Sequence, residues 1–179
     1  TTSGGSLTPS VIPGRTDNVF FDANSGFTAT SKTVTIDNTA NCHNITFSGS
    51  AVVPTLTQST GQTLNIYGSS EWQTGMGTIN VSNIYYRHTG VAKTIKSNGV
   101  KIGNNGGSVI TFEEETSISL LDDLDIDLTL DHLAGVFNTN NHTVKVGTFN
   151  SSNGTKPRTL NFGSSEILII AYGNFQMAG

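Results

Sequence analysis

The sequence predicts an all-β chain, and three observations support that prediction. Ser, Thr and Asn supply 63 of the 179 residues, and Gly adds 20 more. Short runs that alternate apolar and polar residues recur from end to end, which is typical of half-buried strands. Groups of Asn, Gly and Ser separate these runs, and Asn and Gly tolerate the positive φ angles of tight turns. We therefore expect many short strands joined by corners.

Ten segments have the composition and alternation of strands. They are residues 19–22, 33–37, 44–47, 64–67, 79–82, 109–112, 124–131, 143–146, 159–162 and 166–170. The segment 124–131 is the clearest, because Leu or Ile occupies every second position. A helix is the alternative only over residues 113–124, where three apolar residues fall at helical spacing, although residues 117–120 alternate as a strand does.

The way these strands assemble stays open on pattern alone. Residues 64–70 and 160–165 look like relaxed repeats of one another, but no strict repeat period is visible. An irregular parallel β-solenoid explains the strands and turns, and a β-sandwich or jelly roll explains them equally well.

Composition excludes several classes of partner. Only 12% of residues are charged, and the nine cations are scattered. Binding to nucleic acid needs clustered Lys and Arg, so we expect none. No apolar run has the length of a membrane span, so we expect no membrane insertion. The single cysteine, Cys42, rules out an internal disulfide and is expected to be a small buried residue.

One resemblance favours the β-solenoid over the β-sandwich or jelly roll. The N-terminal part of the chain resembles the repeat-rich secreted surface proteins of gliding and gut Bacteroidetes-type bacteria. The segments that carry this resemblance are residues 13–22, 33–37 and 42–49, the last of which contains Cys42. Residues 64–69, 133–140 and 158–165 look like continuing turns of the same family. The resemblance implies a right-handed parallel β-helix, export to the cell surface and a part in adhesin-like or fibre-like chains. It carries over no catalytic residues.

The predicted organisation is a linker-like segment over residues 1–12 and a single β-solenoid domain over residues 13–179, as a fragment of a longer chain. The opening segment is rich in Ser, Thr and Gly, which is typical of flexible linkers.

An acidic run is the strongest candidate for chemistry. Asp125, Asp127 and Asp131 share one face of the predicted strand 124–131. Paired carboxylates can hydrolyse glycosidic bonds, and carboxylate oxygens also suit calcium. An EF-hand is excluded because Leu128 and Ala134 stand where the loop needs Gly and Glu. A looser calcium site at Asp125 and Asp127 remains the only cofactor prediction, beside a solvated polar face.

Aromatic residues are the second candidate, because an aromatic ring stacks well on a sugar. Trp72, Tyr85, Tyr86 and Tyr172 are the candidates for binding glycans. Neighbouring strand residues point to opposite faces, so one ring of Tyr85 and Tyr86 should lie inside and the other outside. Trp72 follows a predicted turn and is expected to be exposed. The alternative for each ring is packing in the core.

Three functions remain open on these grounds. The leading hypothesis is a non-enzymatic structural or adhesive module of an extracellular surface or fibre protein, which contacts glycans or sister chains. The alternatives are a β-helix that binds or processes glycans and a segment of a phage tail fibre or spike.

Overall fold

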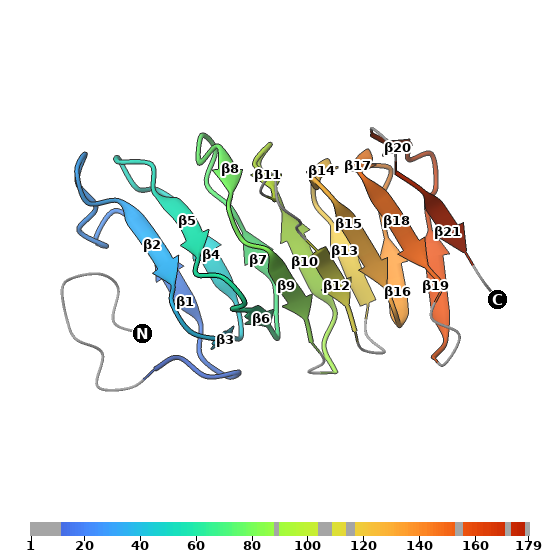
Figure 1. Cartoon of the computed structure of the whole chain (residues 1–179), viewed down its shortest axis with the longest axis horizontal. Coiled ribbons are helices and arrows are strands. Elements are labelled where there is room, and N and C mark those ends of the chain that lie inside the picture. The colour runs from blue at the N-terminus through green and yellow to red at the C-terminus, as the bar shows by residue number, and fades with distance from the viewer. Residues whose placement is uncertain are drawn as a thin grey trace.

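The chain folds as a right-handed parallel β-solenoid with three sides (Figure 1). The computed structural model describes residues 12–87, 90–103, 109–113, 117–152, 156–170 and 173–177. These residues form 21 strands and no helix, and the strands pair in parallel. The predicted all-β class and parallel β-helix are thus confirmed. The β-sandwich alternative is wrong, and so is the helical alternative, since Ser117–Leu120 is a strand.

Each turn of the chain contributes one strand to each of three faces. Face 1 contains β1 (Val19–Phe21), β4 (Ile45–Phe47), β7 (Ser70–Glu71), β10 (Lys93–Lys96), β13 (Ser117–Leu120), β16 (Gly135–Asn138) and β19 (Arg158–Asn161). Face 2 contains β2 (Thr33–Ile36), β5 (Thr55–Gln58), β8 (Thr78–Ile79), β11 (Lys101–Ile102), β14 (Leu124–Asp125), β17 (Val144–Val146) and β20 (Ile167–Ile169). Face 3 contains β3 (Ala40–Cys42), β6 (Leu64–Ile66), β9 (Asn83–Tyr86), β12 (Val109–Phe112), β15 (Thr129–His132), β18 (Thr148–Ser151) and β21 (Phe175–Met177).

We call one such turn of three strands a rung. Faces 1 and 3 are each one continuous seven-stranded sheet. Face 2 consists of three shorter sheets, which single bridges from Thr57 to Asn80 and from Ile102 to Ile126 join into one series. The strands thus form seven rungs in chain order.

Rung length varies, which explains why the sequence shows no strict period. Ile118 lies beside Phe137, 19 residues further on, whereas Val19 lies beside Ile45, 26 residues further on. The strands stay short and regular, and the difference in length falls in the corners between them.

Inward side chains of successive rungs stack into apolar columns that form one core. On face 3 such a column contains Ala40, Leu64, Ile84, Ile110, Leu130, Phe149 and Phe175. Near face 1, the ring of Phe47 stacks on Phe21 at 4.3 Å and tilts against Trp72 at 5.7 Å between centroids. Each fully buried large apolar side chain contributes about 1.5–3 kcal/mol, so this core is the main source of stability.

The segment 124–131 is not one strand, which corrects the clearest strand prediction. The chain turns from face 2 to face 3 at Asp127 and Leu128, between β14 and β15. Leu128 stands at this corner with 43% of its surface exposed, although its place in the alternating pattern matches that of buried neighbours. Alternation continues through a corner, so it could not reveal where the strand ends.

The corner at Leu128 also requires glycine at the neighbouring position of the next rung, which is Gly147. A Cβ on Gly147 would lie 2.5 Å from the carbonyl oxygen of Leu128. The next residue, Thr148, donates its backbone N–H to that oxygen at 2.5 Å, so the two turns pack directly against each other.

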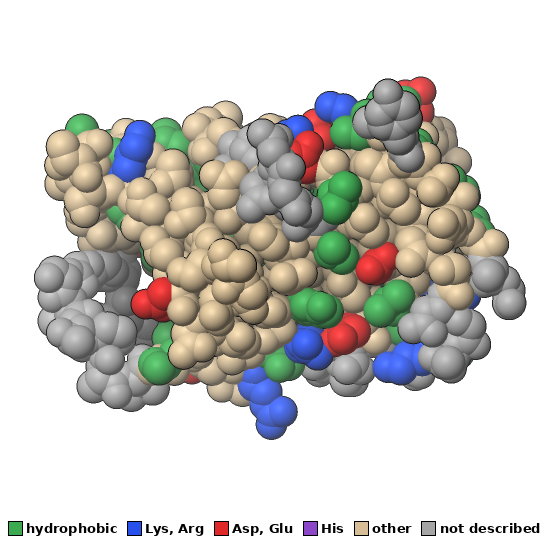
Figure 2. Space-filling view, viewed as in Figure 1, with side chains coloured by type: hydrophobic (Ala, Val, Ile, Leu, Met, Phe, Trp, Pro, Cys, Tyr) green, Lys and Arg blue, Asp and Glu red, His purple; other side chains and the backbone are tan. Residues whose placement is uncertain are grey.

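The outer surface is largely polar and carries few charges, as Figure 2 shows for one side of the molecule. No helix in the described part of the chain is long and apolar enough to cross a membrane.

Candidate functional site

Asp125 lies on the outer side of face 2 and Asp127 at the corner that follows it, and each carboxylate is bonded to a lysine. Asp125 accepts a bond from Lys145 Nζ at 2.9 Å, and the two residues are direct partners in β14 and β17. Asp127 Oδ1 lies 2.6 Å from Lys101 Nζ, which comes from the rung before. The pKa of Lys101 is raised, first by its hydrogen bond to Asp127. Both carboxylates therefore serve as bonds between rungs.

The third carboxylate of the run lies elsewhere. Asp131 belongs to β15 on face 3, where Asn150 Nδ2 donates to its Oδ1 at 3.0 Å. The prediction that Asp125, Asp127 and Asp131 share one face is therefore wrong, because the corner at Leu128 separates them. Across the described ranges, no three His, Cys, Asp or Glu residues lie close enough together to hold a metal ion. A calcium site at Asp125 and Asp127 stays a prediction, and the paired lysines do not favour it.

Two of the aromatic candidates lie in the core. Trp72 and Tyr86 are both 0% exposed, so the expected exposure of Trp72 is wrong. Trp72 directly follows β7 and continues its inward alternation, so the chain does not yet turn there. Neither ring can stack on a ligand outside the solenoid. Tyr172 lies outside the described residues.

Tyr85 and Tyr86 point to opposite sides of face 3, as the alternation predicted. Tyr85 is half-buried on the outside, and the Arg87 guanidinium lies 4.9 Å from the centre of its ring. Arg87 also donates to Asn65 Oδ1 at 2.8 Å and forms an ion pair with Glu113. The Arg87 guanidinium therefore covers part of the Tyr85 ring and holds it in place on a polar surface.

The feature that sequence reasoning missed is a column of polar side chains along the outside of face 3. We call it the face 3 ladder, and its members are Asn41, Asn65, Tyr85, Thr111, Asp131, Asn150 and Gln176. Its members bond to one another at two places along the column. Asn65 Nδ2 donates to Asn41 Oδ1 at 3.0 Å, and Asn150 donates to Asp131.

Face 1 carries a second polar column, which we call the face 1 ladder. Its members include Asn18, Asn44, Ser69, Thr94, Ser119, Asn138 and Asn161. Asn44 Nδ2 donates to Asn18 Oδ1 at 2.8 Å, and Asn161 Nδ2 donates to Asn138 Oδ1 at 2.6 Å. Stacked amides of this kind join the first rung to the second and the sixth rung to the seventh without using charge.

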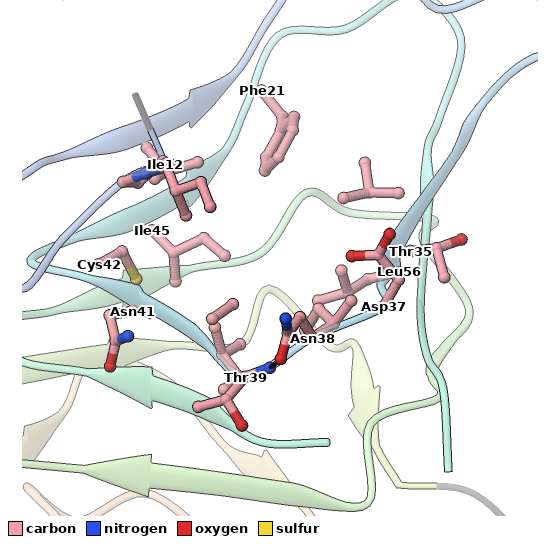
Figure 3. A pocket seen from close by; sticks show the side chains of 16 residues that line it. Ile12, Phe21, Thr35, Asp37, Asn38, Thr39, Asn41, Cys42, Ile45 and Leu56 are labelled. Atoms are coloured by element: carbon pink, nitrogen blue, oxygen red, sulfur yellow. Dashed lines mark hydrogen bonds between the residues drawn. The ribbon is translucent and has the colours of Figure 1, made fainter. Parts of the chain in front are cut away.

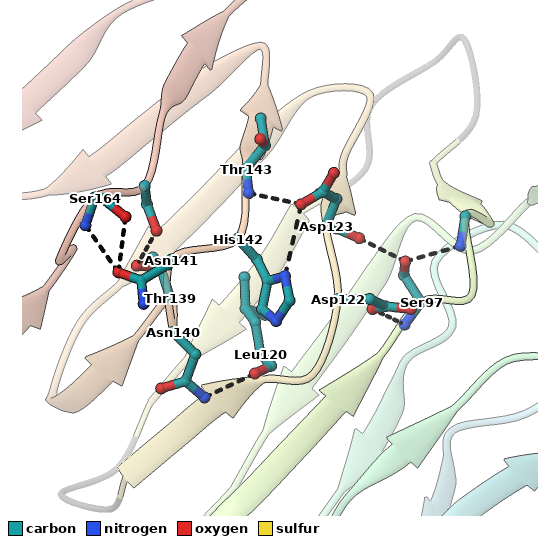
Figure 4. Close-up of polar contacts among 12 residues, drawn as sticks. Ser97, Leu120, Asp122, Asp123, Thr139, Asn140, Asn141, His142, Thr143 and Ser164 are labelled. Atoms are coloured by element: carbon teal, nitrogen blue, oxygen red, sulfur yellow. Dashed lines mark hydrogen bonds and ion pairs between the residues drawn. The ribbon is translucent and has the colours of Figure 1, made fainter.

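Polar side chains also hold the corners between faces 1 and 2 (Figure 4). The carboxylate of Asp122 accepts the backbone N–H groups of Ser97 at 2.6 Å and Asn98 at 2.5 Å. Asp123 Oδ1 accepts the N–H of Thr143 at 2.8 Å and lies 3.8 Å from His142 Nδ1. These carboxylates satisfy backbone donors of neighbouring rungs, so their role is structural.

Several polar groups inside the solenoid are also paired, whereas the buried Trp72 Nε1 has no hydrogen-bond partner among the described residues. Tyr86 Oη and Ser70 Oγ lie 2.5 Å apart, both buried. His132 is 0% exposed, with Nε2 3.0 Å from the carbonyl oxygen of Gly135 and Nδ1 3.4 Å from Ser151 Oγ. Burial lowers the pKa of His132, which keeps the imidazole neutral near pH 7. This serine–histidine contact is enclosed by the core, so it offers no nucleophile to an outside substrate.

A cavity of about 340 Å³ opens at the N-terminal end of the core (Figure 3). Apolar side chains from all three faces line it, among them Phe21, Val34, Ala40 and Cys42. Cys42 is 2% exposed as predicted, and burial raises the pKa of its thiol to about 12. The thiol is therefore protonated at neutral pH, and the cavity lies at the N-terminal end of the part of the core that the structure describes.

Comparisons of the chain with models of protein families, with curated proteins and with solved structures give no match.

Proposed function

We propose that the chain is a non-enzymatic structural and adhesive module of an extracellular surface or fibre protein. It would act as a stiff rod with neutral polar faces. The observation that carries the proposal is the continuity of the core and of the outer polar columns through all seven rungs. In a solenoid each rung contacts only its neighbours, so stiffness depends on the strength of every step from rung to rung.

Ion pairs strengthen those steps on every face. Glu71 pairs with Lys96 at 2.8 Å on face 1, Arg87 with Glu113 on face 3, and Asp125 with Lys145 at 2.9 Å on face 2. In each pair the two residues lie in neighbouring rungs. Exposed pairs contribute little energy, about 0–1 kcal/mol each. Opposite charges placed side by side do favour one register over its alternatives, which suits a rod that must not slip.

The face 3 ladder is the surface that we propose for adhesion, through its members other than Asn65 and Thr111, which are only 6% and 3% exposed. Parallel strands place its amide, hydroxyl and carboxylate groups about 4.8 Å apart along the rod. Glycans offer hydroxyl groups in dense rows, and each hydrogen bond to such a row contributes only about 1 kcal/mol. Binding would therefore be weak for one contact and would depend on many contacts made together.

Adhesion by face 3 is tested by comparing one lysine substitution on each face. Thr148→Lys on face 3, Ser119→Lys on face 1 and Thr57→Lys on face 2 all alter half-buried outward residues. The module is displayed in many copies on beads and applied to an array of surface glycans. We expect the face 3 variant to lose retention while the other two variants retain it. Equal retention by all three, or no retention of the parent beads, contradicts the adhesive role.

Catalysis is tested separately on the same glycans. Asp127→Asn removes one carboxylate of the acidic pair but leaves an oxygen that can accept from Lys101. We expect neither the parent chain nor the variant to release reducing sugar. Release by the parent that falls in the variant would favour a glycan-processing enzyme instead.

A further inference from the structure

Face 2 is interrupted at two levels where faces 1 and 3 are continuous. Its strands form three separate sheets, namely β2 with β5, β8 with β11, and β14 with β17 and β20 (Figure 1). A single bridge crosses each of the two interruptions, which we call seams. Thr57 faces Asn80 at the first seam, and Ile102 faces Ile126 at the second. Faces 1 and 3 continue past both levels as sheets of seven strands.

The second seam lies between the fourth and fifth rungs, and the local backbone accounts for it. β11 ends at Ile102, and Gly103 directly after it takes a φ of 142°, which residues with a side chain rarely adopt. β14 ends at Asp125, two residues before the corner at Asp127. At the same level β12 and β15 pair over four positions on face 3, and β10 and β13 pair over three on face 1. The seam therefore has the fewest paired backbone positions between these two rungs.

An ion pair crosses the second seam. Lys101 of the fourth rung places its Nζ 2.6 Å from Asp127 Oδ1 of the fifth rung. The pKa of Lys101 is raised, first by its hydrogen bond to Asp127 and further by the charge of Asp125, which lies directly beside Lys101 in register. Asp125 Oδ2 is held by Lys145, whereas its Oδ1 has no hydrogen-bond partner among the described residues. Lys101 is therefore attracted to two carboxylates of the next rung.

The first seam is bridged by an uncharged side chain instead. Gln58 Oε1 accepts the backbone N–H of Ser82 at 2.8 Å, which joins the second rung to the third. Within the described ranges, no ion pair crosses this seam. The chain thus contains two seams that are each crossed by one backbone bridge, and only the second is held by charge.

We propose that the solenoid opens on face 2 at the second seam, and that Lys101 is the latch that keeps this seam closed. Faces 1 and 3 stay paired while face 2 opens, so the rod bends at this level toward the edge that those two faces share. The closed seam keeps Ile102 and Ile126, both 0% exposed, away from water. Regions with few bonds across them open at a lower free energy than the whole chain unfolds. The seam is a property of the fold, so its test is independent of glycan binding.

Hydrogen exchange of three backbone amides at one level tests the opening. The N–H groups of Asp127, Leu133 and Leu121 each donate to the fourth rung at 2.9 Å, on faces 2, 3 and 1 in that order. Nuclear magnetic resonance follows each amide of the folded chain in heavy water, with rates corrected for local sequence. We expect the Asp127 amide to exchange about tenfold faster than the other two, because opening of the seam breaks its bond alone. Equal protection of the three amides overturns the opening.

Lys101→Met tests the latch, and Lys96→Met is the matched control. Lys96 pairs with Glu71 at 2.8 Å on face 1, within a continuous sheet. We expect Lys101→Met to speed exchange of the Asp127 amide by about fivefold more and to leave the Leu133 amide unchanged. The control variant should leave both amides unchanged. Exchange that speeds equally at both amides in Lys101→Met reports a loss of global stability and overturns the latch, and so does an unchanged Asp127 amide.

Salt gives a readout that needs no variant. At about 1 M sodium chloride the screening length falls to about 3 Å, which weakens the ion pair but not a bond from an amide oxygen to the backbone. The Asn80 amide donates to Leu56 across the first seam at 3.0 Å and serves as the reference. We expect salt to speed exchange of the Asp127 amide and not that of Asn80. An equal response of the two seams overturns the role of charge.

Distances between pairs of spin labels test the bending. Asn80→Cys and Leu168→Cys place labels on face 2 on either side of the second seam, and Cys42 does not react because it is buried. Asn83→Cys and Thr148→Cys place a second pair across the same level on face 3. We expect Lys101→Met to lengthen and broaden the distances on face 2 while those on face 3 stay the same. Unchanged distances on face 2, or an equal change on both faces, overturns the bending.

Discussion

The buried hydrogen bond between Tyr86 and Ser70 provides a test of the core that depends on one contact. Tyr86 ends β9 on face 3 and Ser70 begins β7 on face 1, so the bond spans the interior of one rung. The two side chains are 0% and 2% exposed, and their oxygens lie 2.5 Å apart. Burial raises the pKa of the Tyr86 hydroxyl above its ordinary value, so the hydroxyl is protonated at neutral pH.

Removing one partner should cost more than the bond itself contributes. Tyr86→Phe leaves Ser70 Oγ without this partner in the core, and Ser70→Ala does the same to the tyrosine hydroxyl. A buried polar group left without a partner costs about 1–3 kcal/mol, whereas removing both partners avoids most of that cost. We therefore expect each single variant to lose about 1–3 kcal/mol of unfolding free energy. The double variant should lose less than their sum by about 1–2 kcal/mol.

Denaturant titration followed by circular dichroism measures these losses for the parent, the two single variants and the double variant. The dependence of the free energy on denaturant must stay constant across the four chains for the comparison to hold. Tyr85→Phe on the outside of the same strand is the matched control and should change stability by less than about 0.5 kcal/mol. Additive losses in the double variant would show that the two hydroxyls do not meet in the core.

Three further predictions follow from burial. Trp72→Ala should cost about 3–5 kcal/mol by thermal or chemical unfolding, whereas Tyr85→Ala should cost far less, and equal losses would contradict the inward position of Trp72. Burial lowers the pKa of His132 below its ordinary 6.5, so stability should be constant above that pH and fall as the pH drops below it, when the unfolded chain takes up the proton first. This loss should disappear in His132→Gln, and a loss that persists would assign it to other groups. Gly147→Ala should cost about 1–3 kcal/mol because its Cβ meets a backbone oxygen at 2.5 Å, whereas Gly14→Ala, with 3.5 Å to its nearest atom, should cost little.

Strand positions could be predicted because alternation follows directly from burial on one side. Segments 33–37 and 109–112 coincide closely with β2 and β12, and the inward residues are those that the alternation selects. Strands with polar or charged residues at several positions escaped the prediction. Face 1 has the clearest case in β10, where Lys93 points inward and is 1% exposed. A period-2 pattern requires apolar inward residues, and this strand does not supply them at each position.

The ion pairs and the two polar ladders could not be predicted from the sequence, because they depend on contacts between rungs. Asp125 and Lys145 are 20 residues apart, and Arg87 and Glu113 are 26 apart, so no fixed spacing links charged partners. Ladder amides such as Asn41 and Asn65 look like any other Asn in a chain that contains 18 of them. Only the corner lengths decide which of these side chains come together, and corners carry no periodic signal.

The apparent sequence repeats do not occupy equivalent places in the fold, and the reason bears on how the solenoid keeps its register. Residues 64–70 and 160–165 look alike, yet Leu64–Ile66 lies on face 3 and Arg158–Asn161 on face 1. A solenoid of identical rungs could shift by one whole rung and recover almost every contact. Here rungs of different length place single large residues, such as Trp72 and Tyr86, at one level of the core each. A shifted rung would leave a cavity at one level and an overlap at the next, so unequal corners and unrepeated aromatic residues together favour one register.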